Sequence, residues 1–323
     1  MLLIVTSTRD ATADYLVGRI KKTKLPFVRL DTDCELDSLD IQFGSNGPLL
    51  KGAGWSISPN EVTSLWFRRP TPLGSDADPE PKAEHKWILE EWSCALEGFL
   101  SHIKVRRWIN HPTNNIRAGS KMEQLTRARS FGLNVPESIV TRDQEVVRSF
   151  WEQCDKKIIV KPLSAGLVEE GDGISTSLIY TNQVTVEHFK GLEDISGCPT
   201  FFQRLISKSF DVRVTWLDGK YFSVKLERLT NDGVQIVDIR RDNMKGVKYT
   251  LIEMPVSVGS ALSDMLSSYE LRFAAIDFVV DHVGNWFFLE INPNGQWAWL
   301  DLAGITDIAG RFLDIFHGAG EMM

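Results

Sequence analysis

Two carboxylates and an amide recur at strand spacing near the C-terminus, in FAAIDFVVD and NWFFLEINPN. If these strands form a hairpin that turns at Val283-Gly284, Asp277 lies opposite Glu290 and Asn292 shares their face. Like charges that face each other destabilise a sheet, whereas a bound cation reverses the effect. Oxygen ligands suit Mg²⁺, which also binds waters and phosphates. The pattern predicts a magnesium site on this hairpin. The alternative, that the acids only keep an exposed face soluble, is disfavoured by the apolar residues around them.

Two lysines precede this hairpin. Lys161 ends the apolar strand IIVK and is followed by a loop that contains Ser164 and Gly166. A lysine at such a position neutralises a phosphate while backbone amides of the loop bind it. The loop has neither a Walker motif nor GxGxxG, so an ordinary turn beside a surface lysine is the alternative. Lys121 begins a helix and is by default a surface residue. Gly166, Gly171 and Gly173 are either hinges of a phosphate cover or turn formers.

The elements that must position these groups alternate between strands and helices, which predicts an α/β chain. The first part contains strands at 1–6, 27–30, 39–43 and 62–68 and helices at 13–20 and 87–103. A proline-rich segment, 71–84, reads as a linker or surface loop. The second part contains helices at 118–131, 146–153, 184–192, 262–269 and 305–317, strands at 135–141, 157–161 and 200–205, and a hairpin at 211–227 that turns at Asp218-Gly219.

Composition limits the class of protein. The chain has 323 residues, of which 43% are hydrophobic, so a folded protein of two or three domains is expected. Acids outnumber bases by 43 to 36, which argues against nucleic-acid and membrane partners. Four dispersed cysteines and the lack of a signal segment or a long apolar run favour a cytoplasmic protein.

The motifs taken in order resemble an ATP-grasp ligase: NIRAGSKMEQLTRA, GLNVPESIVT, IIVKP, FFQRLI, DVRV and AAIDFVV…FFLEINPNGQW. The resemblance begins near residue 105 and continues to the C-terminus. It implies an α/β (α+β) ATP-grasp fold with a preceding small domain at 1–105, a central lobe at 106–195 and a C-terminal lobe at 196–323. The segments EINPNGQWAWLD, WFRRP and DIRRDN resemble the microviridin-type (graspetide) peptide macrocyclases more closely.

The resemblance also implies roles for individual residues. ATP phosphates would contact Lys121 and Lys161, with Ser164 and Gly166 in the loop beside them. Adenine would bind the edge of the strand with Gln203, Arg204 and Leu205, through backbone groups of the first and last. Asp211 would lie near the ribose, and Arg213 would hold the γ-phosphate. Mg²⁺ would bind Asp277, Glu290 and Asn292. Arg240 would meet the acceptor carboxylate or the transferred phosphate, with Asp238 as its partner or as a base. Ile239 stands where a Trp is more typical.

The activity implied is ATP-dependent closure of ω-ester or ω-amide rings in a ribosomal precursor peptide, by a homodimer. A leader segment of that peptide would dock on 185–196 and 215–225, with Glu193 and Asp194 accepting a basic residue or simply ending a helix. Arg68 and Arg69 either face the active cleft or end a solvated strand. Trp297 and Trp299 either wall the site or belong to the core. The alternatives are a ligase that adds a free amino acid to a peptide or protein, and a non-catalytic binding module. The module is disfavoured because the lysines, the arginine and the metal ligands are all present.

Overall fold

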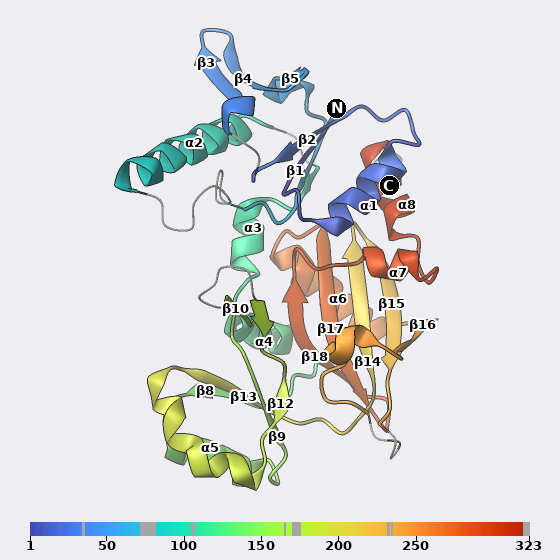
Figure 1. Ribbon diagram of the computed structural model, residues 1–323. Coiled ribbons are helices and arrows are strands. Elements are labelled where there is room, and N and C mark those ends of the chain that lie inside the picture. The colour runs from blue at the N-terminus through green and yellow to red at the C-terminus, as the bar shows by residue number, and fades with distance from the viewer. Residues whose placement is uncertain are drawn as a thin grey trace.

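The computed structural model describes residues 1–33, 36–71, 82–104, 107–164, 166–169, 176–230, 233 and 235–318. Figure 1 shows an N-terminal domain at the top, a lobe with α5 at the bottom, and a large sheet beside them. Mixed helices and sheets confirm the predicted α/β class. None of the helices in the described ranges is long and apolar enough to cross a membrane.

The N-terminal domain is built on a parallel sheet in the order β2-β1-β6-β7. Strand β1 is buried along its whole length, which suits a strand covered on both faces. The elements of the N-terminal domain are β1 (Leu2–Thr6), α1 (Ala11–Ile20), β2 (Phe27–Asp31), β3 (Asp40–Gly44), β4 (Gly47–Gly52), β5 (Trp55–Ile57), β6 (Ser64–Phe67), α2 (Ala83–Ser101) and β7 (Trp108–Ile109), with short 3₁₀ turns at Leu36–Ser38 and Pro59–Glu61. Helix α1 also packs against α7 and α8, so the two ends of the chain share one core.

The middle of the chain forms an antiparallel sheet in the order β12-β9-β13-β8. Its elements are α3 (Pro112–Arg117), α4 (Lys121–Ser130), β8 (Ser138–Thr141), α5 (Gln144–Gln153), β9 (Ile158–Lys161), β12 (Asn182–Gln183) and β13 (Thr200–Arg204), with the small hairpin of β10 (Leu167–Glu169) and β11 (Thr176–Leu178). The helix expected at 118–131 is wrong at its start, because Ser120 caps a separate helix that begins at Lys121. The helix expected at 184–192 is instead a 3₁₀ segment, Val186–Gly197, interrupted at Gly191.

The C-terminal part forms a five-stranded antiparallel sheet in the order β16-β15-β14-β17-β18. Its strands are β14 (Lys208–Leu217), β15 (Lys220–Glu227), β16 (Lys248–Ile252), β17 (Phe273–Asp281) and β18 (Trp286–Asn292). Its helices are α6 (Val256–Ser268), α7 (Ala298–Leu302), α8 (Ile308–Phe316) and a 3₁₀ turn at Arg241–Met244. Helices α4 and α6 cover one face, and part of the other face packs on α1, α7 and α8.

The hairpin of β17 and β18 has the predicted pairing, although its turn is not the predicted one. Val280 pairs with Trp286, which centres the turn on Val283 alone. The register then shifts by one residue at Leu289, so that Asp277 pairs with Glu290. This bulge returns the two carboxylates to one face of the sheet, as expected of an extra residue in one strand.

Candidate active site

A row of three charged residues crosses the large sheet. Arg213 on β14 pairs in register with Asp277 on β17, which in turn pairs with Glu290 on β18. The Arg213 Nε lies 3.2 Å from Asp277 Oδ1 as an ion pair. Asn292 follows two residues after Glu290 on the same face, and its Oδ1 accepts a hydrogen bond from the Asn294 amide at 3.0 Å. The structure therefore brings together the three predicted metal ligands and the predicted phosphate-binding arginine.

The two carboxylates of the row have unequal surroundings. Burial raises the pKa of Asp277, and the charge of Glu290 adds to this while Arg213 opposes it. Burial also acts to raise the pKa of Glu290, but the charges of Lys161 and Lys121 outweigh it and hold this pKa below its usual value. The pair carries negative charge inside a ring of cations, an arrangement that suits a metal ion together with phosphates.

The two predicted lysines lie beside this row. Lys121 Nζ is 3.5 Å from Glu290 Oε2 and donates to the carbonyl oxygens of Pro162 and Ser164 at 2.8 and 2.9 Å. Lys161 Nζ lies 4.9 Å from the centre of the Phe201 ring. Burial lowers the pKa of Lys161 to about 8, against the opposing charge of Glu290. Lys121 thus joins the loop after β9 to the acidic strand.

The loop after β9 is held tightly at Gly166. This glycine has a φ of +71°, and a Cβ there would meet the Pro162 ring at 2.7 Å and the Ile179 carbonyl oxygen at 3.1 Å. The Gly166 amide donates to Ser164 Oγ at 3.2 Å. Only glycine fits this position without strain. Gly171 and Gly173 lie outside the described residues.

Asp238 and Arg240 form a fixed pair at the other side of the site. Arg240 Nε and Nη2 donate to the two carboxylate oxygens of Asp238 at 2.9 and 2.7 Å. The Thr181 amide from the central lobe donates to the same carboxylate at 2.9 Å. Burial opposes ionisation, yet these bonds hold the pKa of Asp238 below its usual value. The geometry favours the partner alternative over the base alternative, because a strongly ionised, fully bonded carboxylate is a poor proton acceptor.

Asp211 lies on the face of Arg213, two residues before it on β14. Both of its oxygens accept hydrogen bonds from Lys208 Nζ, at 2.8 and 2.7 Å. Burial raises the pKa of Asp211 to about 6 even with this partner. Its role near a ribose stays a prediction.

The strand predicted to bind adenine is not an edge strand. β13 pairs with β8 on one side and β9 on the other, and the Leu205 amide already donates to the Lys157 carbonyl oxygen at 2.9 Å. Gln203 is buried and donates to Ser138 Oγ at 2.9 Å. Arg204 points to the opposite face, where it pairs with Glu137 and Asp155. The prediction of a free strand edge is therefore wrong, because β8 occupies it, and adenine contacts of these residues stay a hypothesis.

Arg68 supports the site from a buried position that neither alternative of the sequence analysis foresaw. Arg68 is 1% exposed, forms an ion pair with Asp10 at 2.9 Å, and donates to the Gly295 carbonyl oxygen at 3.1 Å. It neither faces a cleft nor ends a solvated strand; it fixes the loop after Asn292. Trp297 belongs to the core. The side chains of Glu193 and Asp194 lie outside the described part of the chain.

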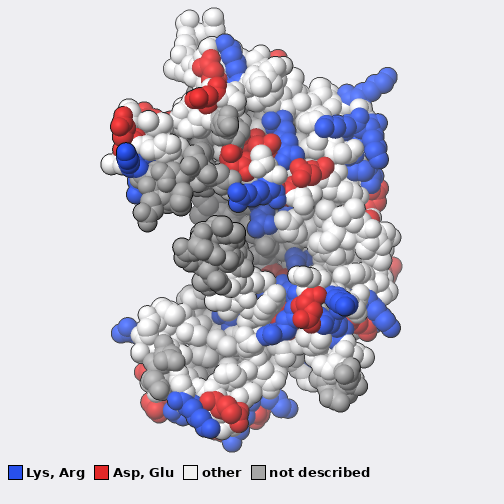
Figure 2. Space-filling view, viewed as in Figure 1, with Lys and Arg blue, Asp and Glu red and all other residues white. Residues whose placement is uncertain are grey.

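The donor set fits Mg²⁺. Asp277, Glu290 and Asn292 offer only oxygen ligands of the hard type that this ion prefers. Within the described residues there is no cluster of three or more His, Cys, Asp or Glu. Mg²⁺ commonly takes phosphate and water oxygens beside one or two carboxylates. Basic and acidic side chains gather beside the hollow between the lower lobe and the N-terminal domain (Figure 2).

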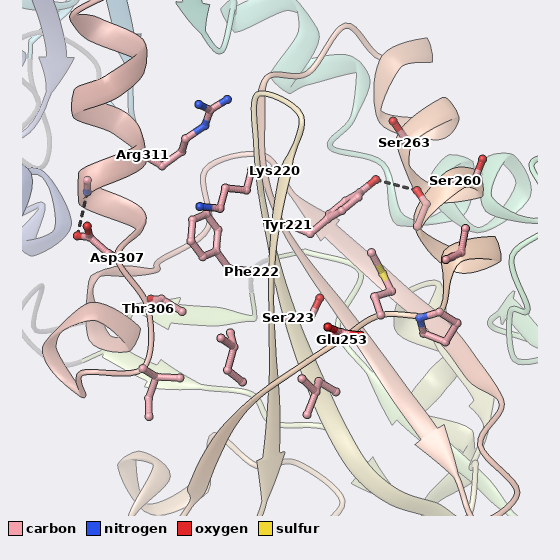
Figure 3. A pocket seen from close by; sticks show the side chains of 18 of the residues that line it. Lys220, Tyr221, Phe222, Ser223, Glu253, Ser260, Ser263, Thr306, Asp307 and Arg311 are labelled. Atoms are coloured by element: carbon pink, nitrogen blue, oxygen red, sulfur yellow. Dashed lines mark hydrogen bonds between the residues drawn. The ribbon is translucent and has the colours of Figure 1, made fainter. Parts of the chain in front are cut away.

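A separate cavity of about 1070 Å³ lies between β15, α6 and α8, with Lys220, Tyr221, Asp307 and Arg311 in its lining. Figure 3 shows the Tyr221 hydroxyl directed at the backbone of α6, where it donates to the Gly259 carbonyl oxygen. None of the lysines, arginines or acids of the charged row lines this cavity. The two sites are therefore distinct.

Comparisons with known proteins identify the family of the chain. The family described as prokaryotic glutathione synthetase, ATP-grasp domain, matches residues 123–292, which is more than half of the chain. A search of the curated proteins finds no match. The chain belongs to this ATP-grasp family.

Solved structures confirm the predicted fold over the whole chain. The macrocyclase MdnC of Microcystis aeruginosa MRC, bound with the precursor peptide MdnA, is 22% identical, with a TM-score of 0.83 over 99% of this chain and 100% of that one. A RiPP-associated ATP-grasp ligase of Chryseobacterium gregarium, in complex with ADP and leader and core peptides, is 24% identical, with a TM-score of 0.86 over 99% and 97%. The macrocyclase MdnB of the same Microcystis is 26% identical, with a TM-score of 0.77 over 98% of each chain. The protein thus has the fold of ATP-grasp ligases, preceded by the small N-terminal domain.

Proposed function

We propose that this protein is an ATP-dependent peptide ligase that activates Glu or Asp side chains of a ribosomal precursor peptide and closes ω-ester or ω-amide rings. The observation that carries the proposal is the Arg213–Asp277–Glu290 row with Lys121 and Lys161 beside it. It is supported by the similarity, along nearly the full length of the chain, to a macrocyclase bound with its precursor peptide and to a RiPP-associated ATP-grasp ligase bound with leader and core peptides.

The first step needs charge neutralisation. A carboxylate is a poor acyl donor, so its oxygen attacks the γ-phosphorus of ATP, ADP leaves and an acyl phosphate forms. Arg213, Lys121 and Lys161 stabilise the charge on the transferred phosphoryl group, as fixed cations do in other phosphoryl transfers. Mg²⁺, held by Asp277, Glu290 and Asn292, adds to this neutralisation when it is bound.

The second step needs an oriented acyl group. A hydroxyl or amine of the same peptide attacks the acyl carbon, phosphate leaves, and one proton is released to solvent. Arg240 is held in one orientation by Asp238, and we assign to it the contact with the acyl phosphate or the acceptor. Positioning of this kind is the main contribution a protein makes when the energy comes from ATP.

The proposal includes a partner and a setting. A leader segment of the precursor docks on the 3₁₀ segment Val186–Gly197 and near the turn between β14 and β15, away from the metal ligands. The protein acts as a homodimer in the cytoplasm. These parts are supported by the family resemblance.

Mass spectrometry tests the proposal. The precursor peptide encoded beside this protein is incubated with the protein, ATP and MgCl₂, and a loss of about one water mass per ring is expected. A gain equal to one amino-acid residue in the presence of free amino acids would support the second candidate, a ligase of the glutathione synthetase kind, which the family match favours. A peptide mass that stays unchanged while ATP is in excess contradicts both candidate functions.

A further inference from the structure

The strand that carries Glu290 and Asn292 lies at the edge of its sheet. Among the described strands, β18 pairs only with β17; its other edge meets helix α4 and, at Phe287, a short bridge with Asn134, whose carbonyl oxygen accepts from the Phe288 amide at 2.8 Å. An edge strand leaves alternate backbone N–H and C=O groups without a strand partner. Those groups must be satisfied by something else, because buried backbone groups are seldom left unpaired.

Gln124 on α4 supplies that partner at one residue. Its Oε1 accepts from the Ile291 amide at 2.8 Å, and its Nε2 donates to the Ile291 carbonyl oxygen at 2.8 Å. The same Nε2 donates to the Ala118 carbonyl oxygen at 2.6 Å. Gln124 is 1% exposed, so these bonds form out of contact with water. The side-chain amide therefore pairs with Ile291 as a neighbouring strand would.

The position of this contact matters for the site. Ile291 lies between Glu290 and Asn292, and its own side chain points to the opposite face, into the core. Gln124 is three residues after Lys121, so one turn of α4 carries both. The helix turn that holds the backbone of β18 thus also sets the 3.5 Å separation between Lys121 Nζ and Glu290 Oε2.

We propose that Gln124 is a positioning residue for the metal ligands Glu290 and Asn292. It fixes the direction of the Glu290 and Asn292 side chains through the Ile291 backbone, and it fixes the distance from Lys121 to Glu290. Its loss leaves two buried backbone groups of β18 without partners and allows the strand edge to move relative to α4. This inference rests on the proposed function, since it assigns a role toward Mg²⁺ and nucleotide.

The test compares Gln124→Met with Asn134→Ala. Met keeps the length of the side chain and removes its hydrogen bonds. Asn134 is a matched control, because its Nδ2 donates to the Trp286 carbonyl oxygen of the same strand at 3.3 Å, far along the strand from Glu290. ADP binding is measured by titration calorimetry at a series of MgCl₂ concentrations and in EDTA, together with thermal unfolding of each variant.

Gln124→Met is expected to raise the half-saturating Mg²⁺ concentration by about tenfold or more, because the two buried hydrogen bonds to the Ile291 backbone are lost. ADP binding in EDTA is expected to stay within about twofold of wild type, and Asn134→Ala is expected to keep the wild-type Mg²⁺ dependence. Unchanged Mg²⁺ dependence in folded Gln124→Met overturns the inference. Should that variant not fold, Gln124→Glu, which keeps the size and the acceptor for the Ile291 amide, is measured instead. Failure of both to fold while Asn134→Ala folds also overturns it, because the role is then structural. Lack of Mg²⁺-dependent ADP binding by the wild type contradicts the proposed function instead.

Discussion

The variant Glu290→Gln tests whether Glu290 binds a metal ion or has only a structural role. The substitution keeps the size of the side chain and removes its charge, so the sheet pairing with Asp277 is retained. Under the proposed metal assignment, the Glu290 carboxylate of the wild type attracts Mg²⁺ and repels the phosphates of a metal-free nucleotide. The variant therefore loses the attraction for Mg²⁺ and no longer repels the phosphates of a metal-free nucleotide.

The expected loss of affinity follows from the distances between charges in the site, which are about 4 Å. A unit charge about 4 Å from another interacts by about 4 kcal/mol at an effective dielectric constant of about 20. Lys121, 3.5 Å away, and Lys161 cancel part of it. Taking half leaves about 2 kcal/mol, or about thirtyfold in affinity.

The assay is ADP binding by titration calorimetry, with saturating MgCl₂ and with EDTA. Glu290→Gln is expected to bind ADP about thirtyfold more weakly than wild type with Mg²⁺, and at least as tightly as wild type in EDTA. The control is Glu227→Gln on β15, which is 32% exposed against 28% for Glu290 and pairs with Lys225 at 2.9 Å. An equal loss for Glu290→Gln with and without Mg²⁺, or no loss at all, refutes the metal assignment.

Three further predictions concern other parts of the site. Arg213→Met is expected to lose about a hundredfold or more in peptide-dependent ADP release while ADP binding persists, since a fixed cation stabilises the transferred phosphoryl group; unchanged ADP release would remove that role. Burial lowers the pKa of Lys161 to about 8, so the free protein loses this charge as the pH rises through that value. Nucleotide binding at about pH 9 is therefore expected to take up a proton in the wild type but not in Lys161→Arg. Binding heats of the wild type that do not depend on the ionisation enthalpy of the buffer would contradict this. Gly166→Ala is expected to lower the free energy of unfolding by about 1–3 kcal/mol more than Gly132→Ala, because both have positive φ but only Gly166 lacks room for a Cβ; equal losses in urea unfolding would show that the crowding is relieved.

Local patterns predicted the hairpin of β17 and β18 because strand alternation and turn position are encoded within about twenty residues. The pairing of Asp277 with Glu290 was correct even though the turn was misplaced, since the bulge at Leu289 compensates for the turn. A bulge of this kind has no reliable sequence signal, because it depends on packing against neighbouring strands.

The groups that hold the site together were not predictable in the same way. Arg68 and Gln124 act through contacts with residues more than 160 positions away, and the local sequence does not reveal these contacts. Whether β13 has a free edge depends on where β8 pairs, and this long-range choice cannot be read from the local sequence. Helix ends near Lys121 were predicted only in part, because a cap residue inside an apolar-spaced segment splits it.

Oxygen transfer tests the central claim most directly. The precursor peptide is prepared with ¹⁸O in its Glu and Asp carboxylates, and the phosphate released during ring closure is analysed by mass spectrometry. Activation as an acyl phosphate transfers one carboxylate oxygen to phosphate, so one ¹⁸O per ring is predicted in the released phosphate. Ring closure with unlabelled phosphate would contradict the proposed mechanism, and labelled peptide that neither loses water nor releases phosphate would contradict the proposed function.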